Sequence, residues 1–265
     1  MDHVKDYYDA MTPHYLADLG DTFQAYQLID APDATAERDT ALWLARFAEL
    51  PATASLLDAG CGVCGPALHL AAALDRLSVD AVTISPVQAA IGRRRADAAG
   101  LSARVRPQLA DYHQLPFAAG SFDAVFFLES ACHSTAPDAL YREAWRVLRP
   151  GGTLLVKDVY QREPPLDATN QEAMRRFNEV WRSHCRTLMA DAAAIQQAGF
   201  VDVTASDLST HLDARRFFTA MFRPGQVGRA PSGLGRHHLL KQPAPIVPGA
   251  VRACKPAPAP ADDRS

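Results

Sequence analysis

The chain of 265 residues is 48% hydrophobic, which is enough to bury the core of one large α/β domain. A formal net charge of −3 excludes the strongly basic balance of chains that bind nucleic acid or anionic membranes through their overall charge. An odd number of cysteines, five, is typical of reduced thiols. The sequence shows neither a signal peptide nor an apolar run of membrane-spanning length, so we expect a cytoplasmic protein without a membrane span.

Helical spacing of apolar residues predicts a first helix from Thr35 to Leu50, which Pro51 ends. Beyond it, short apolar runs alternate with helix-like segments. The predicted strands are Ser55–Ala59, Val79–Ile84, Ala103–Leu109, Phe122–Leu128, Thr153–Asp158 and Val201–Ala205, and the predicted helices are Pro66–Leu74, Pro86–Ala99 and Pro137–Leu148. This alternation predicts right-handed βαβ units, and therefore a Rossmann-like, doubly wound and mostly parallel sheet with helices on both faces.

The chain divides into three predicted parts. Residues 1–34 form an aromatic-rich N-terminal segment, residues 35–222 the main domain with an insertion at 160–194 between the fifth and sixth strands, and residues 223–265 an irregular segment. In the insertion, apolar residues at helical spacing predict one amphipathic helix: Met174, Phe177, Trp181, Cys185 and Leu188. In the last part, Gly249–Pro256 is a candidate final strand, and disorder is expected from about Ala257.

The most informative motif is the run Leu56-Leu57-Asp58-Ala59-Gly60-Cys61-Gly62, which links the first predicted strand to a helix starting near Pro66. A strand, a glycine turn and a helix in this order build a nucleotide-type site at the carboxyl edge of a parallel sheet. Glycine lets the backbone approach a ligand closely, and the free N–H groups of the helix start can face a carboxylate or phosphate. We therefore expect a ligand with an adenosine-like body here.

Two other interpretations of this turn are weaker. Gly60, Gly62 and Gly65 satisfy the dinucleotide fingerprint of dehydrogenases, but Thr83 stands where such enzymes want an acidic residue at the end of the second strand. Cys61-x-x-Cys64 has the spacing of a redox or zinc pair, but a structural zinc site needs four ligands and no second cysteine pair exists. We predict no metal site.

Several ordered motifs together resemble the class I S-adenosylmethionine-dependent methyltransferases. They are Asp58–Gly62 after the first strand, Asp111 after the third, Leu115-Pro116-Phe117 leading into Phe122-Asp123-Ala124-Val125, and Leu148-Arg149-Pro150-Gly151-Gly152 before the fifth strand. The resemblance covers about residues 40 to 207. Tyr7-Tyr8-Asp9 through Thr22-Phe23, and Thr83-Ile84-Ser85-Pro86-Val87-Gln88, are similar to segments of sterol and tocopherol C-methyltransferases and their bacterial natural-product relatives.

The resemblance implies S-adenosyl-L-methionine as the cofactor and S-adenosyl-L-homocysteine as its product. The residues implied for the cofactor are Asp58, Gly60, Cys61, Gly62, Thr83, Ile84, Gln88, Asp111, Tyr112 and Glu129. In this chain Cys64 follows the loop where many relatives have glycine, and Thr83 stands where many have an acid for the ribose hydroxyls. Ribose recognition then falls to Thr83, Ser85 or Gln88.

Glu129 and His133 follow the fourth predicted strand, at the edge where ligands bind in such sheets. A carboxylate in an apolar mouth can balance a sulfonium charge or act as a base, and a histidine can deprotonate a hydroxyl or amine near neutral pH. We name both as candidate catalytic residues; the alternative is that they cap the following helix or bond to the N-terminal segment.

The nearer resemblance implies a small-molecule acceptor, an alkene carbon of an isoprenoid-like compound. The candidate acceptor-binding residues are Tyr8, Tyr15, Phe23, Trp181, Arg175 and Arg182. Arg175 and Arg182, together with Arg186, would suit an acceptor that bears a diphosphate. The alternatives are O- or N-methylation of a secondary metabolite with His133 as the base, and a cofactor-binding regulatory protein without catalysis. The sequence leaves a homo-oligomer open.

Overall fold

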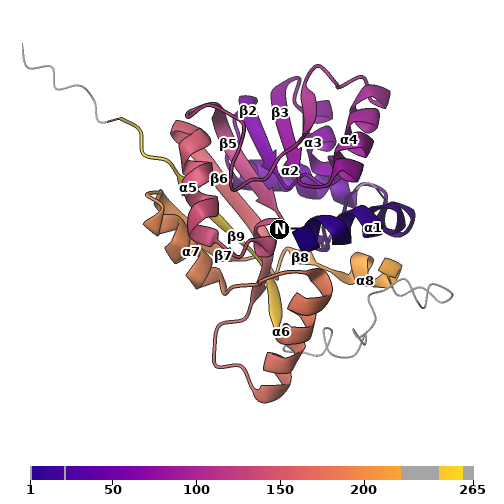
Figure 1. The fold of residues 1–265 in the computed structure, drawn as a ribbon, viewed down its shortest axis with the longest axis vertical. Coiled ribbons are helices and arrows are strands. Elements are labelled where there is room, and N and C mark those ends of the chain that lie inside the picture. The colour runs from indigo at the N-terminus through magenta and orange to yellow at the C-terminus, as the bar shows by residue number, and fades with distance from the viewer. Residues whose placement is uncertain (1, 21, 222–244, 259–265) are drawn as a thin grey trace, which may run out of the picture.

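A seven-stranded sheet forms the centre of the computed structural model, which describes residues 2–20, 22–221 and 245–258 (Figure 1). The strands are β2 (Thr53–Ala59), β3 (Arg76–Thr83), β4 (Val105–Leu109), β5 (Phe122–Leu128), β6 (Leu148–Gln161), β7 (Val201–Asp207) and β9 (Ile246–Cys254), in the order β4-β3-β2-β5-β6-β9-β7. Strands β2 to β6 pair in parallel, and β9 is antiparallel to both β6 and β7. The predicted mostly parallel sheet is confirmed.

Helices cover both faces of this sheet (Figure 1). Residues of α2 (Ala36–Phe47), α3 (Gly65–Ala73) and α4 (Pro86–Ala98) share one hydrophobic cluster, and those of α5 (Pro137–Val147) and α7 (Leu188–Gln197) share the other. Side chains alternate between the two clusters along each strand, so Phe126 on β5 packs into the first and Phe127 into the second. Both faces are therefore buried, which explains why the strands are continuous apolar runs in the sequence.

The N-terminal segment packs over one end of the sheet. It consists of α1 (Asp2–Leu19) and β1 (Gln27–Leu28), which pairs antiparallel with β8 (Leu212–Asp213) just before α8 (Arg215–Met221). Helix α1 contacts α4 and α8. A buried hydrogen bond of 3.2 Å from the Gln88 amide to Thr12 Oγ1 and a contact between Asp9 and Ser85 join α1 to α4. These polar bonds fix α1 above the carboxyl ends of β2 and β3.

The helix in the insertion ends earlier in the chain than predicted. α6 (Ala168–Trp181) buries Met174 and Phe177 and projects away from the sheet in Figure 1. It ends because Arg182 adopts a left-handed conformation, φ 53°, while its N–H still bonds to the Asn178 carbonyl. Cys185 and Leu188 therefore lie outside this helix, and the prediction of one continuous apolar face was wrong.

The last part of the chain contributes a strand to the sheet. β9 lies within residues 223–265, for which we expected mostly irregular structure, and it overlaps the candidate strand at residues 249–256. The disorder expected from about Ala257 falls mainly on residues 259–265, which lie outside the described residues. Among the helices that the structure describes, none is long and apolar enough to cross a bilayer.

The position of β9 between β6 and β7 predicts that a charge on its buried side chains unfolds the domain. Val251 is fully buried, so Val251→Asp is expected to lower the free energy of unfolding by about 3 kcal/mol or more, because the carboxylate has no buried partner. The control is the same substitution at Val201, which is 43% exposed on the edge strand β7. Thermal unfolding followed by circular dichroism measures both; equal losses would contradict the placement of β9.

Candidate active site

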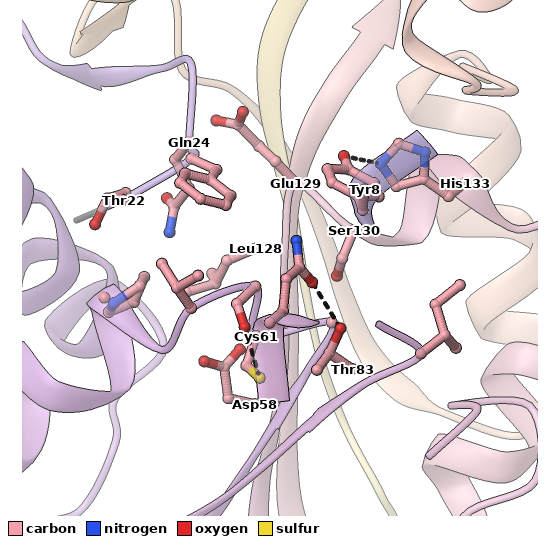
Figure 2. Close-up of a pocket in the computed structure, with 18 of the residues that line it drawn as sticks. Tyr8, Thr22, Gln24, Asp58, Cys61, Thr83, Leu128, Glu129, Ser130 and His133 are labelled. Carbon is pink, nitrogen blue, oxygen red and sulfur yellow. Dashed lines mark hydrogen bonds between the residues drawn. The ribbon is translucent and has the colours of Figure 1, made fainter. Parts of the chain in front are cut away.

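A pocket opens at the carboxyl ends of β2, β3 and β5, with about 770 Å³ of empty space that is partly open to solvent (Figure 2). We call it the glycine-loop pocket. Its lining includes the turn residues Asp58, Gly60, Cys61 and Gly62, the β3 and α4 residues Thr83, Ile84 and Gln88, and also Tyr8, Phe23, Tyr112, Glu129, Ser130 and His133. Most residues predicted for the cofactor are thus brought together at one edge of the sheet.

The turn after β2 requires glycine at position 60. Gly60 has φ +88°, and a Cβ there would overlap the Ser130 side chain, with the hydroxyl oxygen only 2.8 Å away. Ser130 is itself held by a 2.6 Å hydrogen bond from its hydroxyl to the Ala59 carbonyl. The turns after β2 and β5 are therefore in direct contact, and a side chain cannot be inserted between them.

Asp58 presents a buried carboxyl group to this pocket. The residue is 4% exposed, and burial raises the pKa of the carboxyl to about 7. An ammonium group placed beside it would favour the ionised form. The site therefore fits a ligand with a primary ammonium group, as S-adenosylmethionine has.

Thr83 and Gln88 lie at the edge of β3 where ribose recognition is predicted. The Thr83 hydroxyl donates to Gln88 Oε1 over 2.7 Å, shown as a dashed line in Figure 2, and Gln88 donates to Thr12 of α1. All three side chains are at least nine-tenths buried. Thr83 is thus bonded to Gln88, and Gln88 is already bonded to the N-terminal helix.

Asp111 and Tyr112 are placed differently from each other. Tyr112 lines the glycine-loop pocket, and its hydroxyl donates to the Ser130 carbonyl over 3.1 Å. Asp111 is absent from that lining; its half-exposed carboxylate accepts both the backbone N–H and the imidazole Nδ1–H of His113. The His113 hydrogen bonds hold the pKa of Asp111 below its ordinary value. The cofactor contact that the resemblance implies for Asp111 remains a prediction.

A second, aromatic pocket adjoins the first and has about 640 Å³ of empty space. Its lining is Tyr8, Tyr15, Phe23, Ala25, Tyr26, Glu129, Cys132, His133, Val159, Phe177, Trp181, Ser183, Phe217 and Ile246. The two pockets share Tyr8, Phe23, Glu129 and His133. The candidate catalytic residues therefore stand where a ligand in one pocket would meet a ligand in the other.

Buried His133 and half-buried Tyr8 form a hydrogen-bonded pair at this junction (Figure 2). His133 Nδ1 lies 3.0 Å from the Arg182 carbonyl oxygen, which can only accept, so Nδ1 carries the proton and Nε2 accepts from the Tyr8 hydroxyl at 2.8 Å. Burial lowers the pKa of His133, so the imidazole is neutral, and burial holds the pKa of Tyr8 well above its ordinary value. The pair is thus a neutral base joined to a protonated phenol.

Glu129 is bonded on several sides. It has φ 56°, and its carboxylate accepts the backbone N–H groups of Ala25 at 2.6 Å and Tyr26 at 3.0 Å and pairs with Lys157. Sequence analysis missed Lys157, which is fully buried on β6. A lysine inside the apolar run Leu154-Leu155-Val156-Lys157 was the available signal, because a charge is buried only with a partner.

The arginines predicted to bind the acceptor lie outside both pockets. Arg175 is exposed and pairs with Glu172 at 2.7 Å and Glu179 at 3.3 Å. Arg182 is also exposed, and it serves His133 through its backbone carbonyl. Arg186, named with them, pairs with buried Asp191 at 2.7 Å. Trp181, Tyr8, Tyr15 and Phe23, by contrast, line the aromatic pocket, and their contact with an acceptor stays a prediction.

Comparison with known proteins decides the family. A model of the methyltransferase domain matches residues 57–156. Over 187 residues, 69% of this chain and 68% of the relative, the sequence is 35% identical to the 27-O-demethylrifamycin SV methyltransferase of Amycolatopsis mediterranei strain S699. The chain belongs to the S-adenosylmethionine-dependent methyltransferases.

Two other similarities broaden this result. The methyltransferase is 29% identical over 244 residues to cycloartenol-C-24-methyltransferase 1 of Oryza sativa subsp. japonica, covering 86% of this chain and 70% of the relative. Its fold matches the crystal structure of the [4+2]-cyclase SpnF with a TM-score of 0.79 and 25% identity, covering 96% of both chains. Proteins of this fold are thus named for more than one reaction.

The contact at Gly60 makes a sharp prediction for cofactor binding. Gly60→Ala is expected to weaken S-adenosylhomocysteine binding about tenfold or more, because the new Cβ displaces Ser130 or the turn itself. The control is Gly120→Ala, where φ is also positive, +68°, but nothing lies within 4 Å of a new Cβ. Isothermal titration calorimetry measures both affinities. Wild-type affinity in Gly60→Ala would show that the turn yields without cost.

Proposed function

We propose that this methyltransferase methylates an alkene carbon of an apolar, isoprenoid-like acceptor that carries no diphosphate. The observation that supports this most is the aromatic pocket beside the glycine-loop pocket. Half of its lining residues are aromatic: Tyr8, Tyr15, Phe23, Tyr26, Phe177, Trp181 and Phe217. Among the described residues that line it, none is an arginine or lysine that could hold a diphosphate.

Aromatic rings suit this chemistry because methylation of an alkene leaves a positive charge on the acceptor. S-adenosylmethionine supplies a methyl group on a positively charged sulfur. Ring faces such as those of Tyr8 and Phe23 attract a nearby cation by about 0.5–2 kcal/mol each and exclude water that would otherwise capture it. The similarity to a cycloartenol-C-24-methyltransferase supports the same acceptor class.

The reaction ends when the acceptor loses a proton, and we assign this step to Tyr8 and His133. The proton passes to the Tyr8 oxygen while the Tyr8 proton passes to His133 Nε2, which is already its hydrogen-bond acceptor. The Arg182 carbonyl keeps Nδ1 protonated, so Nε2 keeps the lone pair that faces the Tyr8 hydroxyl and can take its proton.

A second candidate function, O-methylation, rests on the same pair. A neutral imidazole linked through Tyr8 to the pocket can equally take the proton of an acceptor hydroxyl. The relative that acts on 27-O-demethylrifamycin SV supports an oxygen acceptor.

One acceptor pair separates these possibilities. Farnesol and farnesyl diphosphate share their alkenes, and farnesol also offers a hydroxyl. With methyl-labelled S-adenosylmethionine, we expect farnesol to be the better substrate by about tenfold or more, because no described residue that lines the aromatic pocket supplies an arginine or lysine for a diphosphate. Nuclear magnetic resonance of the product locates the methyl group. An ether product would favour O-methylation, and turnover of the diphosphate alone would refute the proposal.

The neutral state of His133 predicts an acid limb in the pH profile. Because burial lowers the pKa of His133 below 6.5, the base form persists below that pH, and kcat is expected to fall only when pH drops through the lowered pKa. His133→Asn and Tyr8→Phe should each lower kcat by about a hundredfold and abolish this limb, with little change in S-adenosylhomocysteine affinity. An unchanged acid limb in His133→Asn would assign the titration to another group.

A further inference from the structure

We propose that Glu129 and Lys157 form a buried lid anchor, a pair of positioning residues that fixes residues 22–26 as the wall between the two pockets. Glu129 then acts as a positioning residue instead of the base, and Lys157 acts with it. The proposal rests on the proposed function only in placing an acceptor against this wall.

Glu129 bonds to the wall from one side. Its two carboxylate oxygens accept the N–H groups of Ala25 and Tyr26, over 2.6 and 3.0 Å, and one of them also contacts Lys157 Nζ. A carboxylate offers about four lone-pair sites, and three are already used. With these bonds in place, Glu129 has little capacity to receive a proton from an acceptor.

Lys157 bonds to the same wall through the opposite charge. Its ammonium group donates to the Tyr26 carbonyl over 2.9 Å and to Gln24 Oε1 over 3.4 Å, and it lies 5.9 Å from the centre of the Tyr26 ring. The pair is also joined through the main chain, because the Glu129 N–H donates to the Lys157 carbonyl over 2.7 Å. The N–H groups of Ala25 and Tyr26, the Tyr26 carbonyl and the Gln24 side-chain oxygen therefore all bond to this one ion pair.

The wall contributes to both pockets. Thr22, Phe23 and Gln24 line the glycine-loop pocket, and Phe23, Ala25 and Tyr26 line the aromatic pocket. If the anchor were lost, both pockets would open on this side. We therefore expect an anchor variant to bind the cofactor more weakly and to expose the wall, residues 22–26, to proteolysis, even when no acceptor is present.

Buried ion pairs give a test that separates an anchor from a base. Removing one partner leaves the other charge buried without compensation, whereas replacing both by neutral residues of similar volume is often tolerated. A double variant leaves no charge unpaired, so it can recover part of an anchor's function, but it cannot recover the function of a missing base.

The experiment compares Glu129→Gln, Lys157→Met and the double variant with wild type. Glu179→Gln, on the exposed face of α6, is the matched control. The readouts are S-adenosylhomocysteine affinity by calorimetry, the rate of proteolysis within residues 20–30 with that ligand bound, and kcat and KM. We expect each single variant to lose about tenfold or more in affinity and to be cleaved faster. The double variant is expected to lose less than either single variant, because no charge is left unpaired, but to stay below wild type, because methionine at position 157 cannot bond to the Tyr26 carbonyl.

The contrary results are equally specific. Glu129→Gln with wild-type affinity and lid protection but lost turnover would make Glu129 the base and refute the anchor. A double variant that is no better than the two single variants in affinity and proteolysis would refute it as well. Because affinity and proteolysis need no acceptor, the anchor can succeed or fail independently of the proposed alkene chemistry.

Discussion

The space at Gly60 is the constraint on which the site depends. The turn after β2 passes so close to Ser130, in the turn after β5, that no Cβ fits between them. The same turn is held from the other side, because the Gly60 and Cys61 N–H groups both donate to the Val82 carbonyl of β3 over 2.9 Å. Since β2 lies between β3 and β5, this packing brings Asp58, Thr83 and Glu129 to one pocket from three strands.

The N-terminal segment completes the site through buried polar bonds, which are directional and therefore set its position. Helix α1 is bonded to α4 through Thr12 and Gln88, and residues 24–26 meet Glu129 and Lys157. The hydrogen bond between α1 and α4 uses Gln88, a residue that is also suited to bind ribose hydroxyls. A cofactor that bonds to Gln88 would therefore act on the hydrogen bonds that hold α1, and α1 carries Tyr8.

The chemistry of the site is divided between the two pockets. One offers a carboxyl and hydrogen-bonding groups that fit the cofactor, and the other offers rings with the His133–Tyr8 pair at their junction. The fold is shared with a protein named as a cyclase, so the fold alone does not determine the reaction. The aromatic pocket, where an acceptor would bind, is lined by residues of the N-terminal segment, α6 and α8.

Sequence alone determined the strand order along the chain, the glycine turn and the family, because these depend on local periodicity and on motifs only a few residues long. Phe122–Leu128 was predicted with the bounds of β5, since turn residues flank a short apolar run. The sequence also indicated that Glu129 and His133 lie at the carboxyl edge of the sheet, because they follow a predicted strand and the carboxyl ends of parallel strands meet at that edge.

Only the tertiary structure decided which side chains share a pocket. Arg175 and Trp181 lie on the same helix, yet Trp181 lines the aromatic pocket while Arg175 pairs with Glu172 in solvent, because the orientation of α6 depends on packing with distant segments. The tautomer of His133 depends on a carbonyl 49 residues away, and Ala25 and Tyr26, whose N–H groups bond to Glu129, lie more than 100 residues from it in the chain. Such contacts arise from the packing of whole elements, which local sequence patterns do not contain.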